Sequence, residues 1–158
     1  MILVTLGTQD KDFHRLLVEI DRLIAKKVIK DKVIAQAGYT KFSSNNMEVF
    51  DLIPSEKFNQ LLSTADVIIT HGGVGSIITA LKYDKKVIAV PRLAKYKEHI
   101  NDHQKQIVTK FSALGYIIGV EDVTELERAY KKLPKFKPKK FTHDNSKMLS
   151  LVSELIEK

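Results

Sequence analysis

Short, mainly apolar runs alternate along the chain with longer stretches in which apolar residues recur every three or four positions. The apolar runs are residues 2–6, 32–37, 47–53, 66–70, 86–90 and 115–120. Runs of this length without regular polar alternation are typical of strands buried on both faces, as in a parallel sheet. We therefore predict a parallel sheet of about six strands.

The stretches between these runs have the spacing of amphipathic helices. In the first stretch, one helical face would carry Phe13, Leu16, Leu17, Ile20, Leu23, Ile24 and Val28. Further helices are predicted over residues 55–64, through 77–81, and over 100–112, 122–132 and 145–157. The alternation predicts one α/β domain over residues 1–158, a Rossmann-like, doubly wound sheet that binds ligands outside the carboxyl ends of its strands.

The composition excludes cysteine-dependent sites, whereas the net charge leaves several classes of binding partner open. The 158 residues include no cysteine, which excludes disulfides, thiolate zinc sites and cysteine nucleophiles. No apolar run approaches the roughly 18 residues of a membrane span, and the first residues lack the basic start of a signal peptide, so we expect a cytoplasmic protein. The net charge of +7 is compatible with nucleic acid, anionic membranes or phosphorylated ligands.

A glycine-rich turn, His71-Gly72-Gly73-Val74-Gly75-Ser76, follows the fourth predicted strand and precedes a helix. Glycines let a phosphate approach the unpaired N–H groups of a helix N-terminus, and Ser76 adds a hydroxyl. A tight turn capped by Ser76 is the alternative. The turn is neither a dinucleotide fingerprint, because G-x-G-x-x-G is absent, nor a P-loop, because no Gly-Lys-Ser/Thr is present.

The turn after the first strand, Gly7-Thr8-Gln9, repeats the combination of a glycine and a hydroxyl before a helix. Both turns follow strands and therefore belong to the same edge of the predicted sheet. Two such turns could share a diphosphate, although Gly7-Thr8 alone is not specific.

Polar side chains gather after the fifth strand. They are Glu98, His99, Asn101, Asp102, His103 and Gln104. Two histidines four residues apart are compatible with a metal site, but H-E-x-x-H is absent and we expect no metal. A solvated helix start also fits, because acidic residues favour a helix N-terminus. The third interpretation is hydroxyl recognition, since Gln104 falls on the apolar stripe of Ile107, where a buried amide needs partners.

Four motifs, in this order and spacing, resemble those of a known family. They are Gly7-Thr8, Phe50-Asp51-Leu52-Ile53-Pro54, residues 65–77 and residues 98–104. From residue 1 to about residue 120 the chain resembles the C-terminal, donor-binding domain of family 28 glycosyltransferases. Within that family it is similar to the stand-alone subunits of bacterial exopolysaccharide and capsule glycosyltransferases, and to the cytosolic subunit of the dolichol-linked N-acetylglucosaminyltransferase.

The resemblance implies one half of a GT-B fold that binds a UDP-sugar. The residues that it places at the diphosphate are Gly7, Thr8, Gln9, His71, Gly72, Gly73, Val74, Gly75 and Ser76. Those that it places along the uracil are Phe50, Leu52 and Ile53. Those that it places around the donor sugar are Glu98, Asn101, Asp102, His103 and Gln104. His103-Gln104 matches the pair that holds sugar hydroxyls in related enzymes.

Two positions depart from the family pattern. Thr79 stands where many relatives have a glutamate that binds the ribose, and Gln9 stands where bacterial relatives often have histidine. His71 is expected to donate a hydrogen bond near the phosphates rather than to act as a base. The base is expected on a partner, and the candidates within this chain are His71, Glu98 and His99.

A GT-B enzyme needs a second Rossmann-like half for its acceptor, which a domain of this length does not hold. The resemblance therefore implies a membrane-anchored partner subunit at the inner face of the plasma membrane. The implied reaction moves a hexose from a UDP-sugar to a polyprenyl-diphosphate-linked saccharide in exopolysaccharide or capsule synthesis, without a cofactor. A non-catalytic nucleotide-sensing module is the alternative, and a basic nucleic-acid-binding protein is the third choice, which we disfavour.

Lysines are concentrated near the end of the chain, where residues 131–140 hold six of them. Charge runs are usually solvated, and a solvated connection is the simplest interpretation. Contact with an anionic membrane surface is the second, at around 1 kcal/mol per basic residue near the surface.

Overall fold

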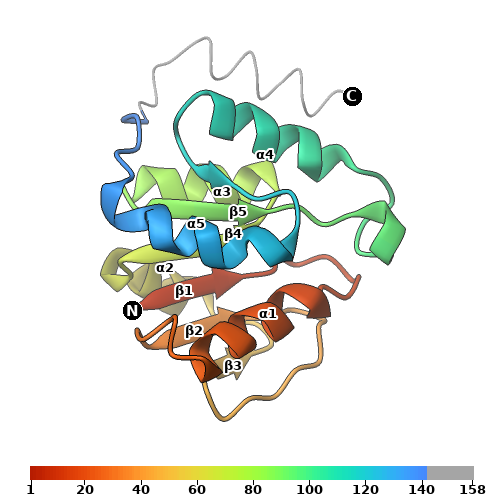
Figure 1. Ribbon diagram of the computed structural model, residues 1–158. Helices are drawn as coiled ribbons and strands as arrows, with labels where there is room; N and C mark the ends of the chain where they lie inside the picture. The colour runs from red at the N-terminus through yellow and green to blue at the C-terminus, as the bar shows by residue number, and fades with distance from the viewer. Residues whose placement is uncertain (142–158) are drawn as a thin grey trace.

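The computed structural model describes residues 1–141, which form a parallel sheet flanked by helices. The strands are β1 (Ile2–Thr5), β2 (Val33–Gln36), β3 (Glu48–Phe50), β4 (Val67–His71), β5 (Lys86–Val90) and β6 (Ile118–Gly119). All neighbouring strands pair in parallel, in the order β3-β2-β1-β4-β5-β6 (Figure 1). The predicted sheet is confirmed.

The described residues form five α-helices, of which the first four lie between strands and the fifth follows β6. They are α1 (His14–Ala25), α2 (Ser55–Thr64), α3 (Val74–Lys82), α4 (His103–Ala113) and α5 (Leu126–Lys132). Short 3₁₀ turns occupy Ala94–Tyr96, Val123–Glu125 and Leu133–Lys135. The helix predicted over 145–157 lies outside the described residues.

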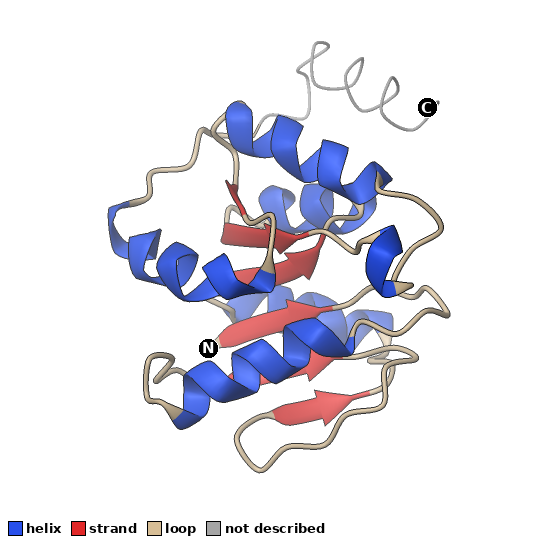
Figure 2. Cartoon of the chain, turned by 45° about the vertical axis from the view of Figure 1, so that its right-hand side comes forward, coloured by secondary structure: helices blue, strands red, loops and turns tan. Residues whose placement is uncertain are grey.

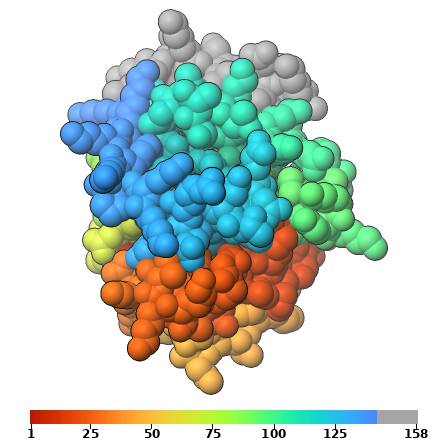
Figure 3. Space-filling view, viewed as in Figure 1, coloured from red at the N-terminus to blue at the C-terminus, as the bar shows by residue number. Residues whose placement is uncertain are grey.

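Each face of the sheet has its own apolar core, because successive strand residues point to opposite faces. Ile2 and Val4 of β1 belong to the core beneath α1 and α5, whereas Leu3 belongs to the core shared with α2, α3 and α4. Figure 2 shows the helices on both sides of the strands, and Figure 3 shows α1 and α5 meeting over one face. Strands buried on both faces explain why the apolar runs lack alternation.

The helix predicted over 100–112 begins later than expected, at His103. Two side-chain acceptors bind backbone N–H groups just before it. Asp102 Oδ1 accepts from the Ala94 N–H at 2.9 Å, and Asn101 Oδ1 accepts from the His103 N–H at 2.9 Å. Such local side-chain bonds compete with helical pairing, so residues 97–102 form a turn and bends.

The sixth strand is shorter than predicted, because residues 115–117 form the turn that follows α4 instead of extending the sheet. The N–H groups of Gly115 and Tyr116 donate to the carbonyls of Ser112 and Phe111. Gly115 has φ +85°, the left-handed conformation that a glycine adopts after a helix end.

The strand order places a topological switch between β1 and β4, which lie side by side in the middle of the sheet. The chain leaves β1 toward β2 on one side and leaves β4 toward β5 on the other. The loops at the carboxyl ends of these two strands therefore diverge and open a crevice, which is where doubly wound sheets bind ligands.

Candidate functional site

A cleft of about 620 Å³ opens at the switch point, beside the carboxyl ends of β1 and β4. Many of the residues expected to contact a donor line it. They are Gly7, Thr8, Gln9, Leu52, Ile53, His71, Gly73, Gly75 and Ser76. The structure thus brings the two glycine turns and the segment after β3 to one cavity.

The N-terminus of α3 forms one wall of the cleft. The Ile77 N–H makes a helical hydrogen bond to the Gly73 carbonyl, so the N–H groups of the preceding first-turn residues have no partner within the helix. Gly75 and Ser76 of this turn line the cleft. Free N–H groups and the positive end of the helix dipole suit a bound phosphate.

The three glycines of the turn have different surroundings. A side chain at Gly72 would meet Gln104 and Val108 of α4 at 2.9 Å, so Gly72 allows α4 to pack closely. A side chain at Gly73 would meet the His71 ring at 2.3 Å. At Gly75 nothing lies within 4 Å of the added atom, and the open space there belongs to the cleft.

His71, the last residue of β4, is buried in the wall of the cleft. Its ring lies within hydrogen-bond distance of three groups, those of Gly73, Ser76 and Gln104. Its Nδ1 accepts from the Gly73 N–H at 3.1 Å and lies 3.2 Å from the Gln104 amide nitrogen. Two donors on Nδ1 leave the proton on Nε2, which donates to Ser76 Oγ at 2.9 Å. Burial, and secondarily the charge of Arg92, lower the pKa of His71 to about 4, so the ring is neutral at pH 7.

The Ser76 hydroxyl is oriented by this histidine and is not a helix cap. Ser76 is the third residue of α3, and the N-cap position is Gly73. Because its oxygen accepts from His71, its own proton is directed elsewhere and is available to a ligand in the cleft. The alternative of a turn capped by Ser76 is therefore wrong.

The loop after β1 lies against the same histidine. Gly7 has φ +79°, and a side chain there would meet His71 Nε2 at 2.6 Å. Only glycine adopts this conformation readily and leaves room for the ring. The structure therefore stacks the first turn directly on the second, as expected for two loops that share one ligand.

The segment after β3 is fixed to the cleft by Gln36, at the end of β2. Gln36 Oε1 accepts from the Ile53 N–H at 2.9 Å, while the carbonyls of Phe50 and Asp51 accept from Ala37 and Gly38. Phe50 does not line the cleft, whereas Leu52 does and has a side chain that is 62% exposed. Contact with a uracil through this segment would therefore involve Leu52 and Ile53.

Gln104 is placed differently from the expectation. Its side chain is buried, and Oε1 accepts from the N–H groups of Gly72 at 2.9 Å and Arg92 at 3.1 Å. With its nitrogen beside His71, the amide is engaged by the protein itself and does not line the cleft. In this structure Gln104 holds the glycine turn, and a bond from its amide to a sugar hydroxyl stays a prediction that these contacts do not support.

The remaining polar residues of 98–104 also lie outside the lining of the cleft. Glu98 is buried and makes a two-bond pair with Arg15, at 2.9 and 3.0 Å. Asn101 and Asp102 are exposed and accept from backbone groups, and His103 is half-buried at the start of α4. His99 accepts from the Asn101 N–H through Nδ1. These residues shape the loop after β5, and the described residues include no cluster able to hold a metal ion.

Several cleft residues were not identified from the sequence. They are Thr5, Gln36, Ser55, Phe58, Leu62 and Ile68. Thr5 and Gln36 end their strands at the ligand edge, a position that would have identified them. The others depend on how α2 and α3 pack, which periodicity alone does not fix. Thr79 donates to the Gly75 carbonyl at 2.8 Å and faces the cleft where a ribose-binding glutamate would otherwise stand.

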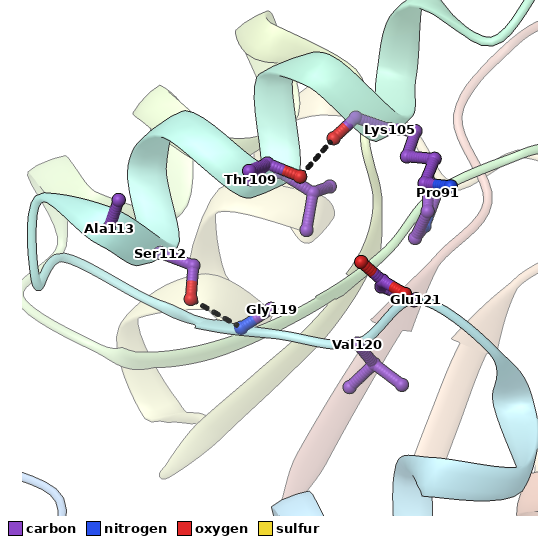
Figure 4. A pocket seen from close by; sticks show the side chains of 9 residues that line it. Pro91, Lys105, Thr109, Ser112, Ala113, Gly119, Val120 and Glu121 are labelled. Atoms are coloured by element: carbon purple, nitrogen blue, oxygen red, sulfur yellow. Dashed lines mark hydrogen bonds between the residues drawn. The ribbon is translucent and has the colours of Figure 1, made fainter.

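A second cavity, of about 280 Å³, lies between α4 and the strand β6 (Figure 4). The Ser112 hydroxyl accepts from the Gly119 N–H, and the Thr109 hydroxyl donates to the Lys105 carbonyl. Both hydroxyls on this wall are thus used within the protein, and none of the expected site residues lines the cavity.

The lysine-rich segment, residues 131–140, lies at the amino ends of the strands, away from the cleft at their carboxyl ends. Lys86, the first residue of β5, donates to the Leu133 carbonyl, and the Lys139 N–H donates to the Gly115 carbonyl just before β6. Figure 1 shows this segment at the left, beside the amino ends of the strands. Among residues 1–141, no helix is long and apolar enough to span a bilayer.

Curated relatives match part of the chain. The UDP-N-acetylglucosamine transferase subunit ALG13 of Candida glabrata is 31% identical over 110 residues, which cover 68% of this chain and 52% of the relative. The subunit of the same name from Candida albicans is 30% identical over 91 residues, which cover 58% of this chain and 29% of the relative. The chain thus spans about half, or less, of the length of these relatives.

Solved structures share the fold. An NMR solution structure of ALG13 superimposes with a TM-score of 0.69 at 20% identity, covering 98% of this chain and 96% of that one. The glycotransferase of kitacinnamycin gives 0.62 at 21% identity, and the chain covers 38% of it. MurG of Acinetobacter baumannii gives 0.54 at 18% identity, and the chain covers 40% of it. The fold is therefore that of a Rossmann-like half of a GT-B protein.

The family comparison covers the whole sequence, because the pattern described as the Glycosyltransferase family 28 C-terminal domain matches residues 1–158. The motifs of the two glycine turns, the switch-point cleft between them and the shared fold agree with this match. The chain belongs to the glycosyltransferase family 28 C-terminal domain family.

Proposed function

We propose that this chain is the donor-binding part of a two-chain glycosyltransferase and binds a UDP-sugar in the switch-point cleft. The observation that carries the proposal is the meeting of the two glycine turns at the N-terminus of α3. UDP-N-acetylglucosamine is the first donor to test, because the curated relatives are named transferase subunits for it. A hexose such as glucose or galactose is the alternative donor.

In the proposed reaction, the bond between the sugar anomeric carbon and the diphosphate oxygen breaks. The acceptor hydroxyl attacks the same carbon, and its proton passes to a base. Negative charge develops on the departing UDP, and N–H groups at the start of α3 with the Ser76 hydroxyl would stabilise that charge. Donors already fixed in place need little reorganisation as the charge forms.

The contacts of the candidate bases support a base on another chain. His71 uses Nδ1 to accept from Gly73 and Nε2 to donate to Ser76, so no lone pair faces the cleft. Glu98 is buried against Arg15, and neither it nor His99 lines the cleft. The acceptor, a polyprenyl-diphosphate-linked saccharide in exopolysaccharide or capsule synthesis, would then be held by a membrane-anchored partner subunit.

The test measures sugar transfer to a polyprenyl-diphosphate-linked acceptor by the purified chain, with and without membranes that contain the partner. Catalysis depends on holding donor and acceptor together, so we expect turnover only when both are present. Full turnover by the chain alone would contradict the two-chain proposal. Binding of UDP-sugar without any transfer in the complete mixture would favour a nucleotide-sensing module.

A further inference from the structure

Arg92, two residues after β5, is a buried cation that does not line the cleft. Its side chain is 1% exposed, and its guanidinium makes hydrogen bonds to three backbone carbonyls. A charge placed in the interior is costly unless its surroundings compensate it. The carbonyls that it binds show which segments the buried guanidinium of Arg92 holds in place.

The guanidinium holds both ends of the first cleft loop. Nη2 donates to the Leu6 carbonyl at 2.6 Å, and Nη1 donates to the Lys11 carbonyl at 2.8 Å. The residues between these two carbonyls include Gly7, Thr8 and Gln9, which line the cleft. One rigid, planar group thus spans the base of this loop, a geometry that a lysine ammonium does not reproduce.

Arg92 also connects this loop to the second one. Its backbone N–H donates to Gln104 Oε1, which at the same time accepts from the Gly72 N–H. The Arg92 side chain therefore fixes the turn after β1, while its backbone shares an acceptor with the turn after β4. The two walls of the cleft meet at this residue.

The charge of Arg92 is not neutralised by a carboxylate bond. Glu98, the nearest buried acid, gives its carboxylate oxygens to Arg15 and to the Leu93 N–H, and offers Arg92 only its backbone carbonyl. Arg15, Glu98 and Arg92 together carry one positive charge in excess, which the Asp12 carboxylate offsets in part through space. Burial lowers the pKa of Arg92, yet a guanidinium remains protonated at neutral pH.

We propose that Arg92 is a positioning residue for the diphosphate of the donor: it fixes the Gly7–Gln9 loop and places a positive charge behind both glycine turns. The inference rests on the proposed UDP-sugar site. It assigns the nucleotide's phosphates, and not its uridine, as the part of the ligand that depends on Arg92. A purely structural arginine would affect both parts alike.

The experiment compares UDP with uridine on Arg92→Lys and Arg92→Gln. UDP affinity is measured by calorimetry and uridine affinity by NMR titration, with Lys105→Gln as the control that removes one exposed charge from the same edge of the sheet. We expect Arg92→Lys to weaken UDP about tenfold, because lysine keeps the charge but lacks the planar fork that holds both ends of the loop. Arg92→Gln should weaken UDP further, because the charge is lost as well. Uridine affinity should change less than about twofold, and the control should bind both ligands like the wild type.

Equal losses for UDP and uridine, or no loss for UDP, would overturn the inference. If the wild type does not bind UDP, the proposed function fails and this inference fails with it; if the wild type binds and the variants bind equally well, only the inference fails. Should the variants not fold, amide hydrogen exchange of the wild type decides. The Gly7 amide, which donates to Thr5 Oγ1 at the base of the clamped loop, should be protected before any nucleotide is added, and immediate exchange there would contradict the clamp.

Discussion

Gly75 is the residue of the second turn at which an added side chain would enter the cleft without touching the protein. We expect Gly75→Val to leave the unfolding temperature nearly unchanged and to weaken UDP binding at least about tenfold, because a branched side chain would occupy the phosphate approach. Calorimetric titration of the folded variant with UDP checks this. An unchanged UDP affinity would show that the N-terminus of α3 does not bind the phosphates.

Gly73→Val is the informative comparison for Gly75→Val. The added side chain would meet the His71 ring, so this variant should lose stability as well as nucleotide binding. The sequence shows only that glycines cluster before a helix. Which glycine faces the ligand and which faces the histidine depends on the orientation of the His71 ring, which the sequence pattern does not give.

His71 makes the stability of the protein depend on pH. Its pKa is lowered to about 4 in the folded protein, while an unfolded histidine titrates near 6.5. As pH falls from about 6.5 to about 4, the unfolded chain takes up a proton that the folded protein refuses, so the free energy of unfolding should fall by up to about 3 kcal/mol. Below pH 4 both states carry the proton and this loss should stop.

Denaturant unfolding at a series of pH values measures the effect, with His71→Gln as the reference. Carboxylates titrate in the same range, and the reference retains them. The difference in stability between wild type and variant should therefore shrink as pH falls from 6.5 to 4. A difference that stays constant with pH would show that His71 is not buried as a neutral group.

At the scale of elements, α4 is tied to the glycine turn through Gln104. Gln104→Ala leaves the N–H groups of Gly72 and Arg92 without their acceptor, which should cost about 1–3 kcal/mol of stability. UDP and UDP-sugar affinities should fall by the same factor, because the amide bonds to protein and not to the hexose. If UDP-sugar affinity fell more than UDP affinity, that result would indicate that the Gln104 amide contacts the sugar directly.

The sequence predicted the elements well and their ends less well. Apolar runs and helical stripes located every strand and the buried faces of α1 and α5, because burial on both faces of a sheet leaves a strong pattern. The start of α4 was predicted three residues too early, since Asn101 and Asp102 bind backbone groups in competition with the helix. Arg92 was not identified, because a buried arginine that bonds to distant carbonyls has no local motif.

At the scale of the molecule, the cleft lies at the carboxyl ends of the strands and the lysine-rich segment lies at their amino ends. We therefore expect any binding of 131–140 to anionic membranes to leave UDP affinity unchanged. Flotation with phosphatidylcholine vesicles, with and without phosphatidylglycerol, measures the first property. Changing Lys131, Lys132, Lys135 and Lys137 together to Gln should abolish vesicle binding, because each lysine contributes about 1 kcal/mol to the free energy of binding an anionic surface. UDP binding should stay intact. A joint loss of both would contradict the separation of the two edges.

The central claim is that the switch-point cleft binds a uridine diphosphate sugar. Calorimetric titration of the purified chain with UDP-N-acetylglucosamine, UDP-glucose and UDP-galactose, beside Gly75→Val as a folded reference, tests it most directly. We predict one-to-one binding of at least one of these donors to the wild type, and loss of that binding in Gly75→Val. Absence of binding by the wild type, or equal binding by both proteins, would contradict the claim.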